Sequence, residues 1–176
     1  PDLLLIAGDL TRDGSLHRFE LEAVKADLDA LPFPVHVVPG NMDTGNKRAR
    51  VDARGHRPGQ NSDLDLNVTS AQLRQFASVF GPLWWSFEHK GVRFSGFADV
   101  VVGSGLPEER AFWQWAGTQA RAPRPRQHVW MMHYAPFMDR PDEPAFDPRA
   151  DYLDWYFSID PPGRGRLLDL FEATGA

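Results

Sequence analysis

The chain has 176 residues, of which 42% are hydrophobic, with a formal net charge of −5 and no cysteine. This length fits one domain with a substantial core, and we expect residues 1–176 to form a single domain. The charge balance gives no indication of nucleic-acid binding, and no apolar run approaches the roughly 20 residues of a membrane helix. The lack of cysteine excludes disulfide scaffolds, thiolate metal sites and thiol nucleophiles, and it agrees with a reducing compartment, so we expect the cytoplasm.

A strand and a helix are predicted at the start of the chain. Residues 3–7 form an apolar run that ends at Gly8 and Asp9, as expected of a buried strand. Ser15 is the expected cap of the helix that follows. Apolar residues recur in that helix at helical spacing, namely Leu16, Phe19, Ala23, Val24, Leu28 and Leu31.

Residues 35–38 predict a second strand, which leads through Gly40 into Asn41. A strand, a helix and a strand in this order predict a right-handed βαβ unit with parallel strands. Asp9 and Asn41 should therefore project from the same edge of the sheet.

Residues 44–68 differ in character, because they contain few apolar residues and a group of cations: Lys47, Arg48, Arg50, Arg54 and Arg57. We interpret this stretch as a solvated, mobile loop. The alternative is that its cations attract an anionic substrate.

Two helices are predicted in the middle of the chain. Thr69 and Gln72 have the spacing of a capping box and predict a helix that runs to about Phe80. Pro107 is typical of the first turn of another helix.

Three more strands are predicted. Residues 84–88 and 92–97 flank a Lys-Gly pair and predict an antiparallel hairpin. Residues 129–132 form a bulky apolar run that ends at His133, which predicts a third strand with a polar group at its end.

The last part of the chain predicts a loop and a helix. We expect an acidic, proline-rich loop over residues 138–162 and a final helix over residues 166–174. We interpret the acidic side chains of the loop as solvated, with recruitment of another cation as the alternative: Asp139, Asp142, Glu143, Asp147, Asp151 and Asp154.

Asp9, Asn41 and His133 each follow a predicted strand. Ligands of α/β sheets bind just beyond the carboxyl ends of the strands, so we expect these three side chains to converge. A carboxylate, an amide oxygen and an imidazole together suit a borderline-hard divalent metal ion. The alternative is that Asp9 caps a turn and that Asn41 is an ordinary turn residue.

Other polar and aromatic residues are assigned structural roles. We expect Asp43 to hold its loop through hydrogen bonds to the backbone. The six tryptophans are expected to pack in the core. We place His36 in the core or at a strand edge, and the following four histidines at the surface: His17, His56, His89 and His128.

The motifs resemble those of the calcineurin-like metallophosphoesterases. That family shows the pattern D-x-H, G-D, G-N-H-D/E, a lone His and G-H-x-H, in this order. Gly8 and Asp9 match the second element, residues 40–43 match the third except at Met42, and His133 matches the fourth. The first element is expected before Leu3 and the last after Ala176, so we expect a metallophosphoesterase domain that is incomplete at both ends.

The resemblance covers nearly the whole chain. It is strongest to the branch containing the calcineurin-like phosphoesterase domain proteins and the bacterial cyclic-nucleotide phosphodiesterases, at residues 40–47, 85–87, 141–143 and 166–169. It implies an α/β fold, specifically an α/β/β/α sandwich of mixed sheets flanked by helices.

The resemblance also implies a chemistry. Two divalent ions (Mn, Fe or Zn) would bind, with Asp9 bridging them, and Asn41 and His133 as ligands of the second ion. Asn41 would also lie close to the substrate phosphate. A metal-activated hydroxide would hydrolyse a phosphomonoester or phosphodiester, either a small phosphate ester or a phosphoprotein. The oligomeric state is not predicted.

Met42 departs from the family pattern. It stands where the family has the His that protonates the leaving group, and a thioether cannot donate a proton. We therefore expect a metallophosphoesterase with low activity for this chain alone. The alternative is a catalytically impaired relative that binds a metal ion or a phosphate as an interaction module.

Overall fold

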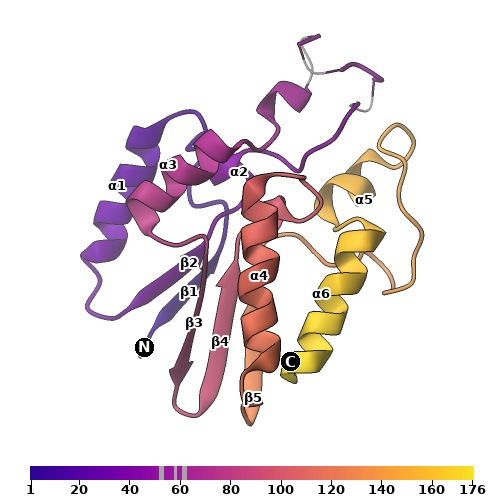
Figure 1. Cartoon of the computed structure of the whole chain (residues 1–176). Coiled ribbons are helices and arrows are strands. Elements are labelled where there is room, and N and C mark those ends of the chain that lie inside the picture. The colour runs from indigo at the N-terminus through magenta and orange to yellow at the C-terminus, as the bar shows by residue number, and fades with distance from the viewer. Residues whose placement is uncertain (52–53, 58, 61–62) are drawn as a thin grey trace.

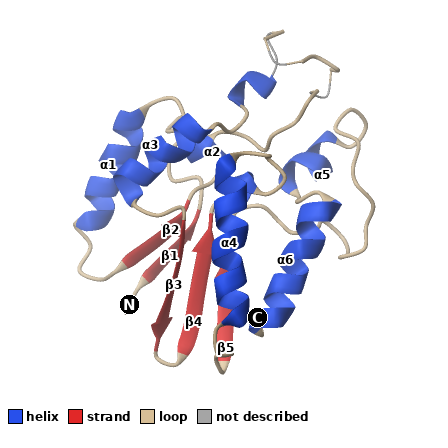
Figure 2. Cartoon of the chain, viewed as in Figure 1, coloured by secondary structure: helices blue, strands red, loops and turns tan. Residues whose placement is uncertain are grey.

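The computed structural model describes residues 1–51, 54–57, 59–60 and 63–176. Within these residues, five strands form two sheets, and helices cover the outer faces of the sheets (Figures 1 and 2). The predicted mixed α/β fold is confirmed. The parts of the predicted basic loop at residues 52–53, 58 and 61–62 lie outside the described residues.

The first sheet is a βαβ unit. Strand β1 (Leu4–Ala7), helix α1 (Arg18–Asp29) and strand β2 (Val35–Val38) follow one another, and the two strands pair in parallel. This confirms the predicted unit. Ala7 lies opposite Val38, so the two strands end level with each other, and the segments that follow them leave the sheet side by side.

The start of α1 differs from the prediction. Ser15 does not cap the helix, and its backbone N–H donates to the carbonyl of Met42, 2.9 Å away. Helix α1 begins three residues later, at Arg18, without a side-chain cap. The buried face is centred on Leu21, and Leu16 and Phe19, two residues of the predicted apolar repeat, are 55% and 66% exposed.

Helix α3 (Ser70–Phe80) lies beside α1 over the first sheet (Figure 1). Its predicted capping box is confirmed, since the backbone N–H of Gln72 donates to Thr69 Oγ1 and that of Thr69 donates to Gln72 Oε1. Two short elements were not predicted: α2 (Asn41–Thr44) and the 3₁₀ helix η1 (Asp63–Leu66). Both are single turns, too short to show a helical period.

The second sheet consists of β3 (Trp84–His89), β4 (Val92–Phe97) and β5 (Gln127–Met131). β3 and β4 form the predicted antiparallel hairpin, and β5 pairs with β4 in parallel. Lys90 and Gly91 both have positive φ, as the favoured two-residue hairpin turn requires. β5 begins two residues before the predicted third strand and ends one residue earlier.

Helices α4 (Pro107–Arg121) and α6 (Pro161–Thr174) cover the second sheet (Figure 1). Between them and the sheet, the rings of Phe97 and Phe112 stack with centroids 4.7 Å apart. Tryptophan side chains pack around this pair, as predicted: Trp84, Trp113, Trp115 and Trp130.

The two sheets touch each other through β2, which contacts both β3 and β4. Trp85 Nε1 donates to the carbonyl of Val37 at 2.7 Å. A Cβ at Gly96 would lie only 2.7 Å from Val38 Cγ1, so glycine permits this close approach. None of the described helices combines the length and apolar character needed to cross a membrane.

The cation-rich stretch of residues 44–68 is not simply a solvated loop. Lys47 is only 6% exposed, and its ammonium group donates to the carbonyls of Trp155 and Ser158 and to the carboxylate of Asp160. The prediction of a solvated Lys47 was wrong, because backbone and carboxylate oxygens from the C-terminal region satisfy its charge.

The acidic segment also differs from the prediction. Helix α5 (Tyr152–Phe157) was not predicted in this segment, and α6 begins at Pro161 rather than near residue 166. Outside the segment, a 3₁₀ turn η2 (Asp99–Val101) was not predicted either. Glu143 is buried, not solvated, and pairs with the buried Arg164 at 3.0 Å. The Arg164 side chain explains this burial, since it neutralises the carboxylate.

The prediction of His128 at the surface was wrong. It is buried on β5, where its Nε2 lies 2.9 Å from Ser95 Oγ on β4. Burial lowers the pKa of the His128 imidazole. His36 is half-buried on β2 with its ring stacked on Phe87, as expected for a strand edge.

Candidate metal centre

Glycines allow the ends of β1, β2 and β5 to meet. A Cβ at Gly8, where φ is +89°, would lie 2.6 Å from His133 Nδ1, closer than any real side chain allows. A Cβ at Gly40 would lie 2.3 Å from Asp9 Oδ1. Asp9 itself adopts a left-handed conformation with φ of 51°, which turns the chain sharply after the strand.

The three predicted ligands converge at this point. His133 Nε2 lies 3.1 Å from Asn41 Oδ1 and 3.4 Å from Asp9 Oδ1. The backbone N–H of Met42 donates to Asp9 Oδ1 at 3.1 Å and orients that carboxylate. The side chains of Asp9 and His133 are 40% and 18% exposed, so the cluster opens to solvent.

The donor set fits a cation. His133 Nδ1 lies 2.8 Å from the carbonyl of Ala7, which can only accept, so Nδ1 carries a proton and donates it. In neutral imidazole, Nε2 then presents a lone pair to the oxygens of Asp9 and Asn41. A carboxylate oxygen and an amide oxygen within 3.4 Å of a ring nitrogen suit a divalent cation, and metal-bound histidines typically donate their other N–H to a backbone carbonyl in this way.

The Asn41 amide is held from its nitrogen side. Its Nδ2 donates to the hydroxyl of Tyr156 at 2.9 Å and to Asn46 Oδ1 at 3.3 Å. Burial raises the pKa of Tyr156 to about 12, so the hydroxyl keeps its proton at neutral pH. That hydroxyl donates in turn to Asn46 Oδ1 at 2.9 Å.

Asp43 holds the surrounding loops, as predicted. It is fully buried, and its carboxylate accepts from the backbone N–H groups of Leu10, Thr11 and Gly40 and from the Thr11 hydroxyl. Burial raises the pKa of the Asp43 carboxyl, and these donors oppose the rise. The segment after Asp9 is thereby tied to the segment before Asn41.

Asp99 is a site residue that the sequence reasoning missed. It is fully buried after β4, and its Oδ2 accepts from the backbone N–H groups of His133 and Tyr134. Complete burial raises the pKa of Asp99 to about 7, against these hydrogen bonds. The signal was present, because Asp99 follows an apolar strand just as Asp9 does.

Comparison with known families agrees with this geometry. A family model described as calcineurin-like phosphoesterase matches residues 1–158. The chain belongs to the calcineurin-like phosphoesterase family. No individual curated protein shows a significant match to the chain.

Membership in the calcineurin-like phosphoesterase family implies divalent metal ions and phosphoester chemistry. Among the described residues, no three His, Cys, Asp or Glu side chains group together to hold a metal ion. The candidate centre therefore depends on the Asn41 amide beside Asp9 and His133. Their roles as metal ligands stay a prediction.

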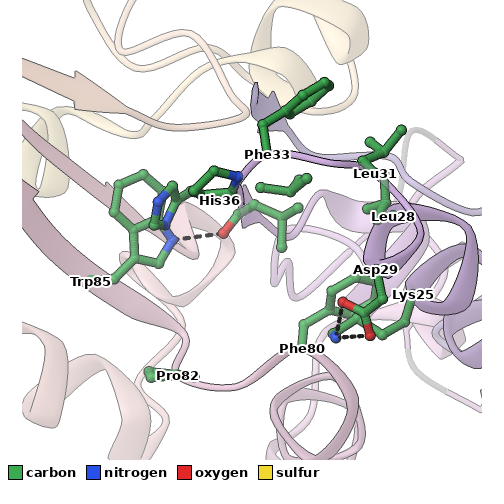
Figure 3. Close-up of a pocket in the computed structure, with 12 residues that line it drawn as sticks. Lys25, Leu28, Asp29, Leu31, Phe33, His36, Phe80, Pro82 and Trp85 are labelled. Atoms are coloured by element: carbon green, nitrogen blue, oxygen red, sulfur yellow. Dashed lines mark hydrogen bonds and ion pairs between the residues drawn. The ribbon is translucent and has the colours of Figure 1, made fainter. Parts of the chain in front are cut away.

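One cavity lies near this centre, and another lies at the far end of β2. Arg48, Arg50 and Arg57 line a cavity of about 1,080 Å³ that also includes Asn67, and the backbone of Asn67 forms a bridge with that of Asn46 beside the centre. Another cavity, of about 410 Å³, is lined by His36, by apolar side chains and by the ion pair of Lys25 and Asp29 (Figure 3). It contacts the first residues of β2, at the end away from Asn41, and so lies outside the candidate centre of this phosphoesterase fold.

Proposed function

We propose that the protein hydrolyses a phosphate ester in a reaction that depends on divalent metal ions held by Asp9, Asn41 and His133. One observation carries this proposal. Nε2 of His133 lies 3.1 Å from Asn41 Oδ1 and 3.4 Å from Asp9 Oδ1, while its Nδ1 lies 2.8 Å from the carbonyl of Ala7. The family membership supports the same chemistry.

The residues of the chain have separable roles in this proposal. Asp9 supplies the negative charge of the site, and the Met42 N–H fixes the direction of its Oδ1. Asn41 and His133 supply neutral oxygen and nitrogen donors. Divalent ions, when bound, polarise the phosphoryl oxygens and lower the pKa of water. We propose two ions, of which these three residues provide part of the ligands.

Met42 limits the substrates that we propose. Its side chain offers no proton to a leaving group, so esters whose leaving group is already a weak base are favoured. The substrate is a small phosphate ester or a phosphoprotein. The three arginines of the larger cavity favour a substrate that carries further negative charge beyond the scissile phosphate.

Metal removal tests the proposal directly. We expect the chain to hydrolyse bis(p-nitrophenyl) phosphate or p-nitrophenyl phosphate with added Mn²⁺, and a chelator to reduce the rate to background, because the charge that stabilises the phosphoryl group is lost. Release of p-nitrophenol measures the rate. Turnover that persists after chelation and dialysis would contradict the proposal, and the preferred ester separates diesterase from monoesterase activity.

Met42→His should restore the missing proton donor. We expect the rate to rise about 10²-fold for an ester with a poor, alkyl leaving group, because general acid catalysis contributes on this scale. The rate for the p-nitrophenyl ester should change little, since that leaving group needs no proton. Met42→Leu is the matched control and should behave as the unsubstituted chain. Equal effects on both esters would show that residue 42 does not face the leaving group.

The Met42 side chain is also the observation that favours the second candidate, a non-catalytic relative that binds a metal ion or phosphate. That candidate predicts Mn²⁺ binding without turnover, both before and after Met42→His.

A further inference from the structure

We propose that Tyr156 and Asn46 are positioning residues that fix the Asn41 amide with its Oδ1 directed at the bound metal ion. The inference deepens the proposed function and rests on it. Neither residue belongs to the motifs from which the centre was predicted, and Tyr156 lies 115 positions beyond Asn41 in the sequence.

The hydrogen bonds form a closed triangle. Asn41 Nδ2 donates to the Tyr156 hydroxyl at 2.9 Å and to Asn46 Oδ1 at 3.3 Å. The Tyr156 hydroxyl directs its own hydrogen to Asn46 Oδ1. With Nδ2 held on this side, Oδ1 of Asn41 faces His133 Nε2, 3.1 Å away.

Asn46 is itself held firmly by its backbone. Its N–H donates to the carbonyl of Leu66 at 2.7 Å, and its carbonyl accepts from the N–H of Val68 at 2.8 Å. Gly45, with φ of +95°, provides the sharp turn between α2 and this bridge. The Asn46 side chain is therefore presented to Asn41 from a fixed main chain.

Tyr156 is held by the neighbouring lysine. Lys47 follows Asn46, and its ammonium group binds the carbonyl of Trp155, the residue before Tyr156, at 2.8 Å. The same ammonium group lies 4.6 Å from the centre of the Trp155 ring. Residues 46–47 and 155–156 thus run side by side, which gives the buried Lys47 a role in the centre without contact with a ligand.

A second connection ties α5 to the strand that carries His133. The backbone N–H of Ala135 donates to the carbonyl of Phe157 at 3.1 Å. The helix that carries Tyr156 is therefore fixed to the segments of both Asn41 and His133. Removal of a hydrogen bond that orients a metal ligand typically lowers the metal affinity by about 10- to 100-fold.

The test is Mn²⁺ binding to the chain, measured by the loss of the free-ion signal in electron paramagnetic resonance. We expect Tyr156→Phe to raise the Kd for Mn²⁺ by about 10- to 100-fold, with little change in thermal unfolding because the ring and its packing remain. Leu153→Ala changes an exposed side chain of the same helix and should leave the Kd unchanged. Asn46→Ala should weaken Mn²⁺ binding. Asn46→Asp should retain it, because a carboxylate at this position still accepts from Asn41 Nδ2 and from the Tyr156 hydroxyl.

His133→Ala distinguishes failure of the proposed metal centre from failure of the positioning role of Tyr156. If His133→Ala loses Mn²⁺ binding while Tyr156→Phe retains it in full, the metal site stands and the positioning role is overturned. If the chain binds no Mn²⁺, or His133→Ala binds it normally, the proposed metal centre is contradicted.

A measurement that needs no metal tests the positioning role even if the chain binds no Mn²⁺. The two side-chain amide protons of Asn41 should give separate, slowly exchanging NMR signals in the unsubstituted chain and exchange faster in Tyr156→Phe. Unchanged exchange in Tyr156→Phe would overturn the inference whatever the metal does.

Discussion

Asp9→Asn should reduce metal-dependent turnover about 10³-fold or more, because it removes the negative charge of the site, and charge stabilisation by bound metal is worth several kcal/mol. The fold should survive this change. Asp9 adopts a left-handed conformation, and asparagine tolerates that conformation as well as aspartate does. The substituted amide also keeps an oxygen for the Met42 N–H. Turnover of the chromogenic ester and thermal unfolding are the two measurements.

His133→Ala should cause a comparable loss, since it removes the nitrogen donor and frees the carbonyl of Ala7. The matched control is His36→Ala, which deletes an imidazole that lines the smaller cavity at the other end of β2 (Figure 3). We expect His36→Ala to retain turnover. Similar losses from His36→Ala and His133→Ala would mean that activity follows global stability and would remove His133 from the site.

The strand-end rule predicted the location of this centre because it depends on local sequence. Each apolar run predicts a strand, and parallel strands bring their carboxyl ends together, so Asp9 and Asn41 follow from the βαβ unit alone. His133 required a further step, since β5 belongs to the other sheet. The contact between β2 and β4 closes that gap, and neither its existence nor its geometry is visible in a periodic pattern.

The supporting residues could not be predicted in the same way. Tyr156 lies on a six-residue helix inside a segment whose composition suggested a solvated loop. Lys47 was predicted to be solvated because its neighbours in the sequence are polar. Its ammonium group is instead buried and donates to carbonyl oxygens more than 100 residues away in the sequence. Such pairings depend on tertiary packing, which overrides local composition. Asp99 is the exception, because the strand-end rule applied consistently would have found it.

Asp43 is the residue whose loss should cost the most stability. We expect Asp43→Ala to lower the free energy of unfolding by about 4 kcal/mol, because buried donors left without an acceptor cost about 1–3 kcal/mol each and are only partly re-satisfied. Its carboxylate accepts from three backbone N–H groups and from the Thr11 hydroxyl, and its side chain is fully buried. Urea unfolding followed by tryptophan fluorescence measures the change.

Asp27→Ala provides the control, since it removes an exposed aspartate from α1 and should change the free energy of unfolding by no more than about 0.5 kcal/mol. Asp43→Asn should fall between the two, because an amide keeps one acceptor but places N–H groups against other donors. Metal affinity should fall together with stability in Asp43→Ala, since Asp43 joins the backbone after Asp9 to that before Asn41. If Asp43→Ala unfolds like the unsubstituted chain, Asp43 does not hold the two strand ends together, and the pairing of β1 with β2 alone does so.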